Sequence, residues 1–166
     1  DLELIATYGL TVLGFDPTPK SSEYLQSTEL PDEFKLFDCG MSGKDGVMTF
    51  NPPIDSTHVS FTTTDRPETK NESIEVQMKA LSTIMKENQH QEIDILKMDI
   101  EGSEYGVIDE ICENDISVKQ ILIEFHHHFS TIPVSRTKKA ISKLNKKGWK
   151  VFNVSENGHE ISLIRV

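Results

Sequence analysis

The chain has 166 residues, of which 36% are hydrophobic and 27% charged, and these totals indicate one globular domain over residues 1–166. Its net charge of −10 argues against nucleic acid or an anionic membrane as a partner, and no apolar stretch approaches the ~20 residues of a membrane span. Cys39 and Cys112 form no CxxC pair and have no metal-ligand spacing, so we expect reduced thiols in a cytoplasmic protein.

The N-terminal region predicts a helix, a strand and a second helix. Residues 2–8 carry apolar side chains at helical spacing, and Gly9 closes this helix. Residues 11–15 (T-V-L-G-F) form a short buried strand that ends at Asp16. A helix is expected around residues 19–26.

The next segment predicts a hairpin followed by a long loop. Residues 34–39 and 47–50 have strand patterns, and the glycine-bearing turn 42–46 between them indicates that they pair. Residues 51–73 hold three prolines and many Thr, Ser and Asp residues, so we expect a surface loop there.

From residue 74 onward, strand and helix patterns alternate. Strands are predicted at residues 74–78, 93–100 and 121–125, and each is followed by a helix, at 79–88, 103–113 and 135–147. Residues 149–154 and 161–166 are predicted to form a closing hairpin. Ser103 is the expected cap of its helix. The alternation predicts an α/β fold with three layers, in which a mostly parallel sheet ends in a C-terminal antiparallel hairpin.

Polar residues follow three of the predicted strands at the edge where ligands bind in open α/β sheets. The first strand ends in Asp16, the second in Asp99 and Glu101, and the third in Glu124 and three consecutive histidines. If the strand continued through residue 101, alternation would point Asp99 and Glu101 to the same side. Two carboxylates on the same side of a core strand lose hydration, and this costs free energy unless a cation or a hydrogen-bond donor compensates for it. The pair therefore favours a functional site.

Two simpler interpretations remain open for these residues. Asp16 before Pro17 is equally typical of a turn former. Asp99, Glu101 and either His126 or His128 are conceivable metal ligands, but no established ligand spacing requires this. We therefore predict no metal site.

Four motifs together resemble the FkbM-type S-adenosylmethionine-dependent methyltransferases, which are class I enzymes. They are L-K-M-D-I-E-G-S-E at 96–104, G-F-D-P-T-P at 14–19, M-S-G-K-D-G at 41–46 and I-E-F-H-H-H at 123–128. The resemblance extends from about residue 10 to residue 166, and the D-I-E-G element is its most specific part. It implies a Rossmann-like sheet and S-adenosyl-L-methionine as cofactor.

The resemblance also implies where the methyl donor binds. Asp16, in the motif with Pro17, would hold the donor's ribose hydroxyls, since a carboxylate can accept two hydroxyl hydrogen bonds. Gly40 and Met41 would flank the adenine. Asp99 would face the methionine end of the donor or the acceptor.

The catalytic residues implied are Asp99, Glu101, His126 and His127. Glu101 and His126 would orient or deprotonate the acceptor, with His127 behind them. The reaction would be methyl transfer, most simply to an oxygen of a small-molecule or glycan acceptor. The 51–73 loop would contribute to the acceptor pocket or a lid.

One departure from the family pattern affects the prediction. The chain lacks the first strand and the glycine-rich loop that follows it, so we expect an N-terminally incomplete methyltransferase domain. A non-catalytic methyltransferase-like binding module is the main alternative, and a nicotinamide-dependent Rossmann oxidoreductase is a weaker one. The acceptor and the oligomeric state do not follow from the sequence.

Overall fold

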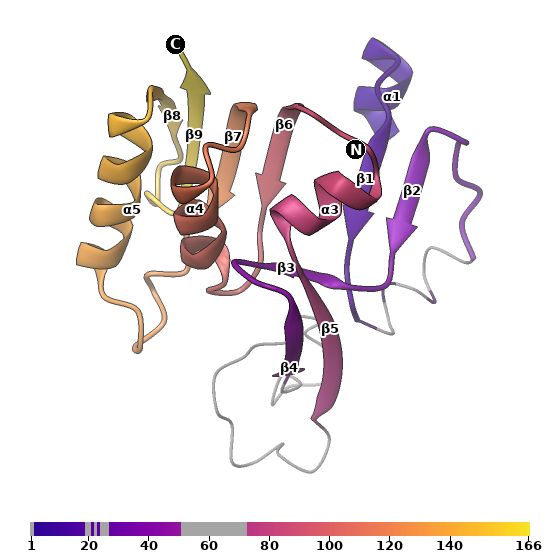
Figure 1. Cartoon of the computed structure of the whole chain (residues 1–166), viewed down its shortest axis with the longest axis horizontal. Helices are drawn as coiled ribbons and strands as arrows, with labels where there is room; N and C mark the ends of the chain where they lie inside the picture. The colour runs from indigo at the N-terminus through magenta and orange to yellow at the C-terminus, as the bar shows by residue number, and fades with distance from the viewer. Residues whose placement is uncertain (1, 19–20, 22, 24–26, 51–72) are drawn as a thin grey trace. The chain divides into compact units, whose positions relative to one another are not determined.

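The computed structural model of the chain describes residues 2–18, 21, 23, 27–50 and 73–166 (Figure 1). Its elements are α1 (Leu2–Tyr8), β1 (Val12–Phe15), β2 (Phe34–Phe37), β3 (Gly40–Ser42), β4 (Gly46–Phe50), β5 (Ile74–Ala80), α3 (Leu81–Glu87), β6 (Ile93–Met98), α4 (Glu104–Glu113), β7 (Val118–Glu124), α5 (Val134–Lys146), β8 (Trp149–Val154) and β9 (Glu160–Arg165). The helix predicted at 19–26 and the loop predicted at 51–73 lie largely outside the described residues.

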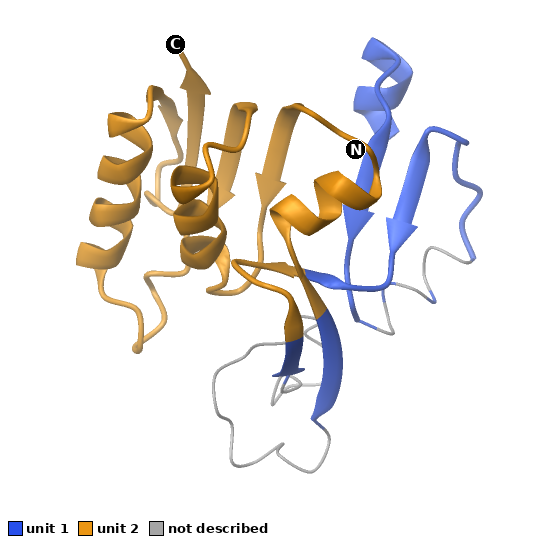
Figure 2. Cartoon of the chain, viewed as in Figure 1, with its two compact units in different colours: residues 1–40, 47–77 blue, residues 41–46, 78–166 orange. Residues whose placement is uncertain are grey.

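The chain divides into two compact units, coloured separately in Figure 2. Unit 1 comprises residues 1–40 and 47–77, and unit 2 comprises residues 41–46 and 78–166. Each unit is described by itself below. That residues 1–166 form a single domain stays a prediction.

Unit 1 contains the predicted N-terminal helix and a parallel strand pair. The helix α1 ends at Gly9, which has a φ of +63° and donates its N–H to the carbonyl of Ile5 at 2.8 Å. A positive φ suits glycine because it has no Cβ. Strands β1 and β2 are parallel, and the rings of Phe15 and Phe37 at their ends stack with centroids 4.8 Å apart.

The predicted hairpin between residues 34–39 and 47–50 is wrong. Strand β2 pairs with β1, and β5 lies between β3 and β4 in a separate three-stranded sheet. The turn has a different role, because the Asp45 carboxylate accepts the N–H of Ala80 at 2.8 Å and the hydroxyl of Thr83 at 2.8 Å. These bonds tie the turn to the junction of β5 and α3, a long-range contact that local turn chemistry does not reveal.

Unit 2 is built on a four-stranded sheet in the order β6-β7-β9-β8. Helices α4 and α5 cover one face of it (Figure 1). The strands bury alternate apolar residues that form one face: Leu96, Met98, Ile121, Ile123, Ile161 and Leu163. Trp149 is buried and donates its indole N–H to the carbonyl of Val118 at 3.1 Å, which satisfies its polar atom.

The sheets are mixed, which corrects the predicted mostly parallel arrangement. Strands β6 and β7 are parallel, whereas β7–β9 and β8–β9 are antiparallel. The α/β class and the C-terminal hairpin are confirmed. Cys39 and Cys112 are both buried, and no disulfide joins them. Within the described part of the chain, no helix combines the length and apolarity that crossing a membrane requires.

Candidate functional site

Asp99 and Glu101 lie in the turn that follows β6, not on a continuing strand. The strand ends at Met98, so strand alternation is not what directs the two carboxylates. The backbone instead turns through a left-handed conformation, with a φ of 52° at Glu101 and 102° at Gly102. A non-glycine residue in this region costs of order 1 kcal/mol, and such conformations cluster at functional sites.

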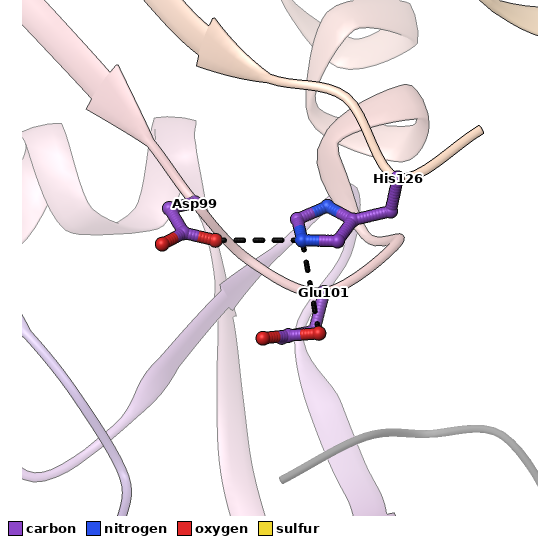
Figure 3. Close-up of side chains that lie close together, drawn as sticks. All are labelled: Asp99, Glu101 and His126. Carbon is purple, nitrogen blue, oxygen red and sulfur yellow. Dashed lines mark ion pairs between the residues drawn. The ribbon is translucent and has the colours of Figure 1, made fainter. Parts of the chain in front are cut away.

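His126 brings the two carboxylates together. It follows β7, which pairs in parallel with β6 so that Met98 lies beside Ile123. The Nε2 atom of His126 is 3.5 Å from Oδ1 of Asp99 and 3.7 Å from Oε2 of Glu101 (Figure 3). The imidazole side chain is only 4% exposed, whereas Asp99 is 50% and Glu101 24% exposed. The cluster is thus open to solvent from the carboxylate side.

Glu104 holds the other side of the imidazole and is fully buried. Its Oε1 lies 3.3 Å from Nδ1 of His126 and accepts the backbone N–H of the same residue at 3.0 Å. Its Oε2 accepts the N–H of Gly102 at 2.9 Å. Ser103 is the N-cap residue of α4 as predicted, but its side chain makes no capping hydrogen bond. The carboxylate of Glu104 instead accepts the N–H of Gly102 in the turn that precedes α4.

The ionised forms of Glu104 and His126 stabilise each other. Burial alone would raise the pKa of Glu104, but its bonds from the side chain and backbone of His126 outweigh burial and lower that pKa. Burial would likewise lower the pKa of His126, but Glu104, Glu101 and Asp99 together raise it. The three carboxylates around the ring favour a positive charge at Nε2, either a proton on the ring or a cation bound to the unprotonated nitrogen.

His127 and His128 are less buried than His126, and the His128 ring lies 5.4 Å from the His126 ring. Nδ1 of His127 lies 3.3 Å from the hydroxyl of Thr137, and its ring meets the edge of His159 with centroids 5.1 Å apart. Partial burial and the neighbouring His159 lower the pKa of His127. His128 is exposed and stacks on His159 at 4.8 Å. The structure thus distinguishes three residues that are indistinguishable in sequence, and the catalytic role of His127 stays a prediction.

Asp16, Gly40 and Met41 are the residues predicted to bind the methyl donor. Asp16 directly follows β1, and its Oδ1 accepts the N–H of Thr18 at 2.8 Å and the hydroxyl of Thr18 at 2.7 Å. These bonds make the turn that the simpler interpretation expects, but they use only one carboxylate oxygen. Gly40 and Met41 are both buried in β3, and their contact with adenine stays a prediction.

Comparison with known proteins identifies the family. The model described as "Methyltransferase FkbM domain" matches residues 3–151. The chain belongs to this family. The resemblance found in the D-I-E-G and neighbouring motifs is therefore confirmed.

A solved structure supports the fold. The crystal structure of Methyltransferase FkbM from Methylobacillus flagellatus KT superposes with a TM-score of 0.54 at 15% sequence identity. The match covers 97% of this chain but 39% of that protein, so the chain spans well under half of its length. No curated protein matches the chain.

Glu104 is the residue beside the cluster that the sequence interpretation missed. It is the last residue of the L-K-M-D-I-E-G-S-E motif, yet no role was predicted for it. One signal was present: Glu104, Ile108 and Ile111 follow the spacing i, i+4, i+7, which places this glutamate on the apolar face of α4. A carboxylate on a buried face requires donors, and His126 and Gly102 provide them.

Proposed function

We propose that the chain transfers a methyl group from S-adenosyl-L-methionine to an oxygen of a small-molecule or glycan acceptor. The observation that carries the proposal is membership of the FkbM methyltransferase family over residues 3–151. In the reaction the bond from the sulfonium sulfur to the methyl carbon breaks, a bond from the acceptor oxygen to that carbon forms, and the acceptor loses a proton. The protein must therefore position the acceptor and receive its proton.

The cluster in unit 2 has the groups for this work. Glu101 and His126 would orient the acceptor hydroxyl and receive its proton, and Asp99 would face the donor's methionine end or the acceptor. The support is geometric: Nε2 of His126 lies within 4 Å of both carboxylates, and the 50% exposure of Asp99 leaves the cluster accessible. His127 would act behind His126, through its position beside Thr137.

The donor's ribose would bind at Asp16, with Pro17 adjacent and Gly40 and Met41 beside the adenine. The support lies in the bonding of the carboxylate. Among the described residues its two hydrogen bonds use Oδ1, so Oδ2 is available to accept a hydroxyl.

The proposal includes three further points. The domain would be a single class I methyltransferase domain with a Rossmann-like, three-layer sheet, in keeping with the structural similarity to the FkbM methyltransferase crystal structure. Two buried cysteines that form no disulfide favour a reducing compartment such as the cytoplasm. A nucleic acid would not be the acceptor, because the net charge of −10 repels polyanions.

Calorimetric titration with S-adenosylhomocysteine tests the donor site. Asp16→Asn is the most informative variant, since its remaining oxygen can still accept both bonds from Thr18 while the second acceptor oxygen is lost. We expect saturable binding that this variant weakens roughly 10- to 100-fold, the value of one or two hydrogen bonds to a charged group. Asp32→Asn, at an exposed position of unit 1, should leave binding unchanged.

Either of two results would contradict the proposed donor site: no saturable binding by the unaltered chain, or equal affinity in the chain and its Asp16→Asn variant. Methyl transfer is then measured with a donor labelled in its methyl group and a panel of hydroxyl acceptors. Glu101→Gln should lower turnover about 10²- to 10⁴-fold, the usual effect of losing general acid–base assistance. Glu156→Gln, exposed in the loop between β8 and β9, is the charge-matched control.

A further inference from the structure

Three potential ligand atoms from different parts of unit 2 converge on one point. The carboxylates of Asp99 and Glu101 and the imidazole of His126 each offer one atom, and these atoms all lie within 4.8 Å of one another. The first two residues follow β6 and the third follows β7, so the parallel pairing of these strands builds the group. The convergence is visible in Figure 3, where both carboxylates lie beside the same ring nitrogen.

The spacing of these atoms is close to that around a divalent ion. With metal–ligand bonds of about 2.1 Å, neighbouring ligands of a six- or four-coordinate ion lie about 3.0 to 3.4 Å apart. The His126 nitrogen is 3.5 Å from the Asp99 oxygen and 3.7 Å from the Glu101 oxygen. All three ligand atoms lie within 4.8 Å of one another. The two carboxylates are partly exposed and the imidazole is buried, so rotation of the carboxylate side chains would bring the atoms to ligand spacing.

Glu104 provides an independent indication. A metal-binding histidine usually bonds through its second ring nitrogen to a carboxylate, which fixes the tautomer and the ring orientation. Glu104 is fully buried and lies 3.3 Å from Nδ1 of His126, so it fixes the ring with Nε2 directed at Asp99 and Glu101. This buried support is a separate observation from the cluster of ligands itself.

The charge of the group also favours a cation. Three carboxylates, those of Asp99, Glu101 and Glu104, surround one imidazole. Even a protonated imidazole balances only one of the three negative charges. A divalent cation bound to a neutral imidazole balances two of them, and one imidazole with two carboxylates is a donor set that Mn²⁺ accepts.

We propose that Asp99, Glu101 and His126 bind one divalent cation of the Mn²⁺ type, with Glu104 as the carboxylate that positions His126. This inference departs from the sequence prediction of no metal. It deepens the proposed function and rests on it for its role. The cation would bind the acceptor hydroxyl and lower its pKa, so that the proton leaves to solvent. Asp99, Glu101 and His126 would then hold the cation in place of receiving the proton directly. The binding itself requires neither donor nor acceptor.

The test is titration of the chain with Mn²⁺ alone, followed by the electron paramagnetic resonance signal of the free ion. We expect one saturable site per chain. Asp99→Asn and Glu101→Gln should each weaken it at least tenfold, and Glu104→Gln should weaken it about 10- to 100-fold, as for other residues that orient metal ligands. Glu113→Gln, exposed at the end of α4, removes the same charge and should leave affinity unchanged.

The absence of a saturable site would overturn the proposal. So would a site that Asp99→Asn and Glu101→Gln leave unaltered, since the ion would then be held by the acidic surface in general. Asp99 is half exposed, so its variant is expected to fold, and far-ultraviolet circular dichroism checks this. The S-adenosylhomocysteine titration contains no metal, so it separates failure of the proposed methyl transfer from failure of the cation site.

Discussion

Replacing Glu104 by glutamine keeps the size of the side chain but changes which bonds it can make. Both carboxylate oxygens accept N–H groups, Oε1 from His126 and Oε2 from Gly102. A glutamine amide has one acceptor oxygen and one NH₂ donor. In either orientation, one backbone N–H in this buried place faces an NH₂ group instead of an oxygen.

The cost follows from these contacts. A buried donor without an acceptor costs about 1–3 kcal/mol, and loss of the charge weakens the bond to the His126 ring by about a further 1 kcal/mol. We therefore expect Glu104→Gln to lower the free energy of unfolding by about 2–4 kcal/mol. Glu104→Ala should lower it by about 3–5 kcal/mol, as for other buried ion pairs that lose one partner.

Urea unfolding followed by tryptophan fluorescence measures this change. Trp149 is the single tryptophan and is buried in unit 2, the same unit as Glu104. Glu113→Gln, exposed on the same helix, is the control and should change stability by less than about 0.5 kcal/mol. If Glu104→Gln unfolds at the same urea concentration as this control, the buried bonds do not stabilise the fold as argued.

Three further predictions concern the packing of unit 2. A Cβ on Gly43 would lie 2.5 Å from the carbonyl oxygen of Gly106, so Gly43→Ala should lower the free energy of unfolding by about 1–3 kcal/mol. Gly46 has open space around it, so Gly46→Ala should leave the free energy of unfolding unchanged. Equal denaturation midpoints for the two variants would contradict this prediction. Glu110 accepts the first two N–H groups of α3, so Glu110→Ala should cost about 1–3 kcal/mol in the same assay, and an unchanged midpoint would show that the cap contributes nothing. The hydrogen bond from the backbone N–H of Ala80 lowers the pKa of Asp45, so the ionised carboxylate stabilises the fold above the ordinary carboxyl pKa and this stabilisation is lost as pH falls. The difference in free energy of unfolding between the unaltered chain and Asp45→Asn should therefore shrink in acid. A difference that does not change with pH would refute this prediction.

The sequence by itself determined the family and, from residue 74 onward, the order of the elements. Hydrophobic periodicity predicted the strands and helices of unit 2 to within a few residues, because one buried face imposes a period of 2 or 3.6 on the chain. The D-I-E-G motif predicted the family and two members of the cluster, Asp99 and Glu101. These features are local, so a single sequence records them.

Only the tertiary structure decided which groups meet. His126 is selected from three consecutive histidines by the pairing of β6 with β7, since that register brings its ring to the turn after β6. The failed hairpin and the missed buried bonds of Glu104 and Glu110 have the same origin: their partners are distant in sequence or lie across a turn. The sequence does not distinguish an exposed carboxylate from a buried one that accepts hydrogen bonds. Only the folded chain brings the hydrogen-bond donor close to the carboxylate.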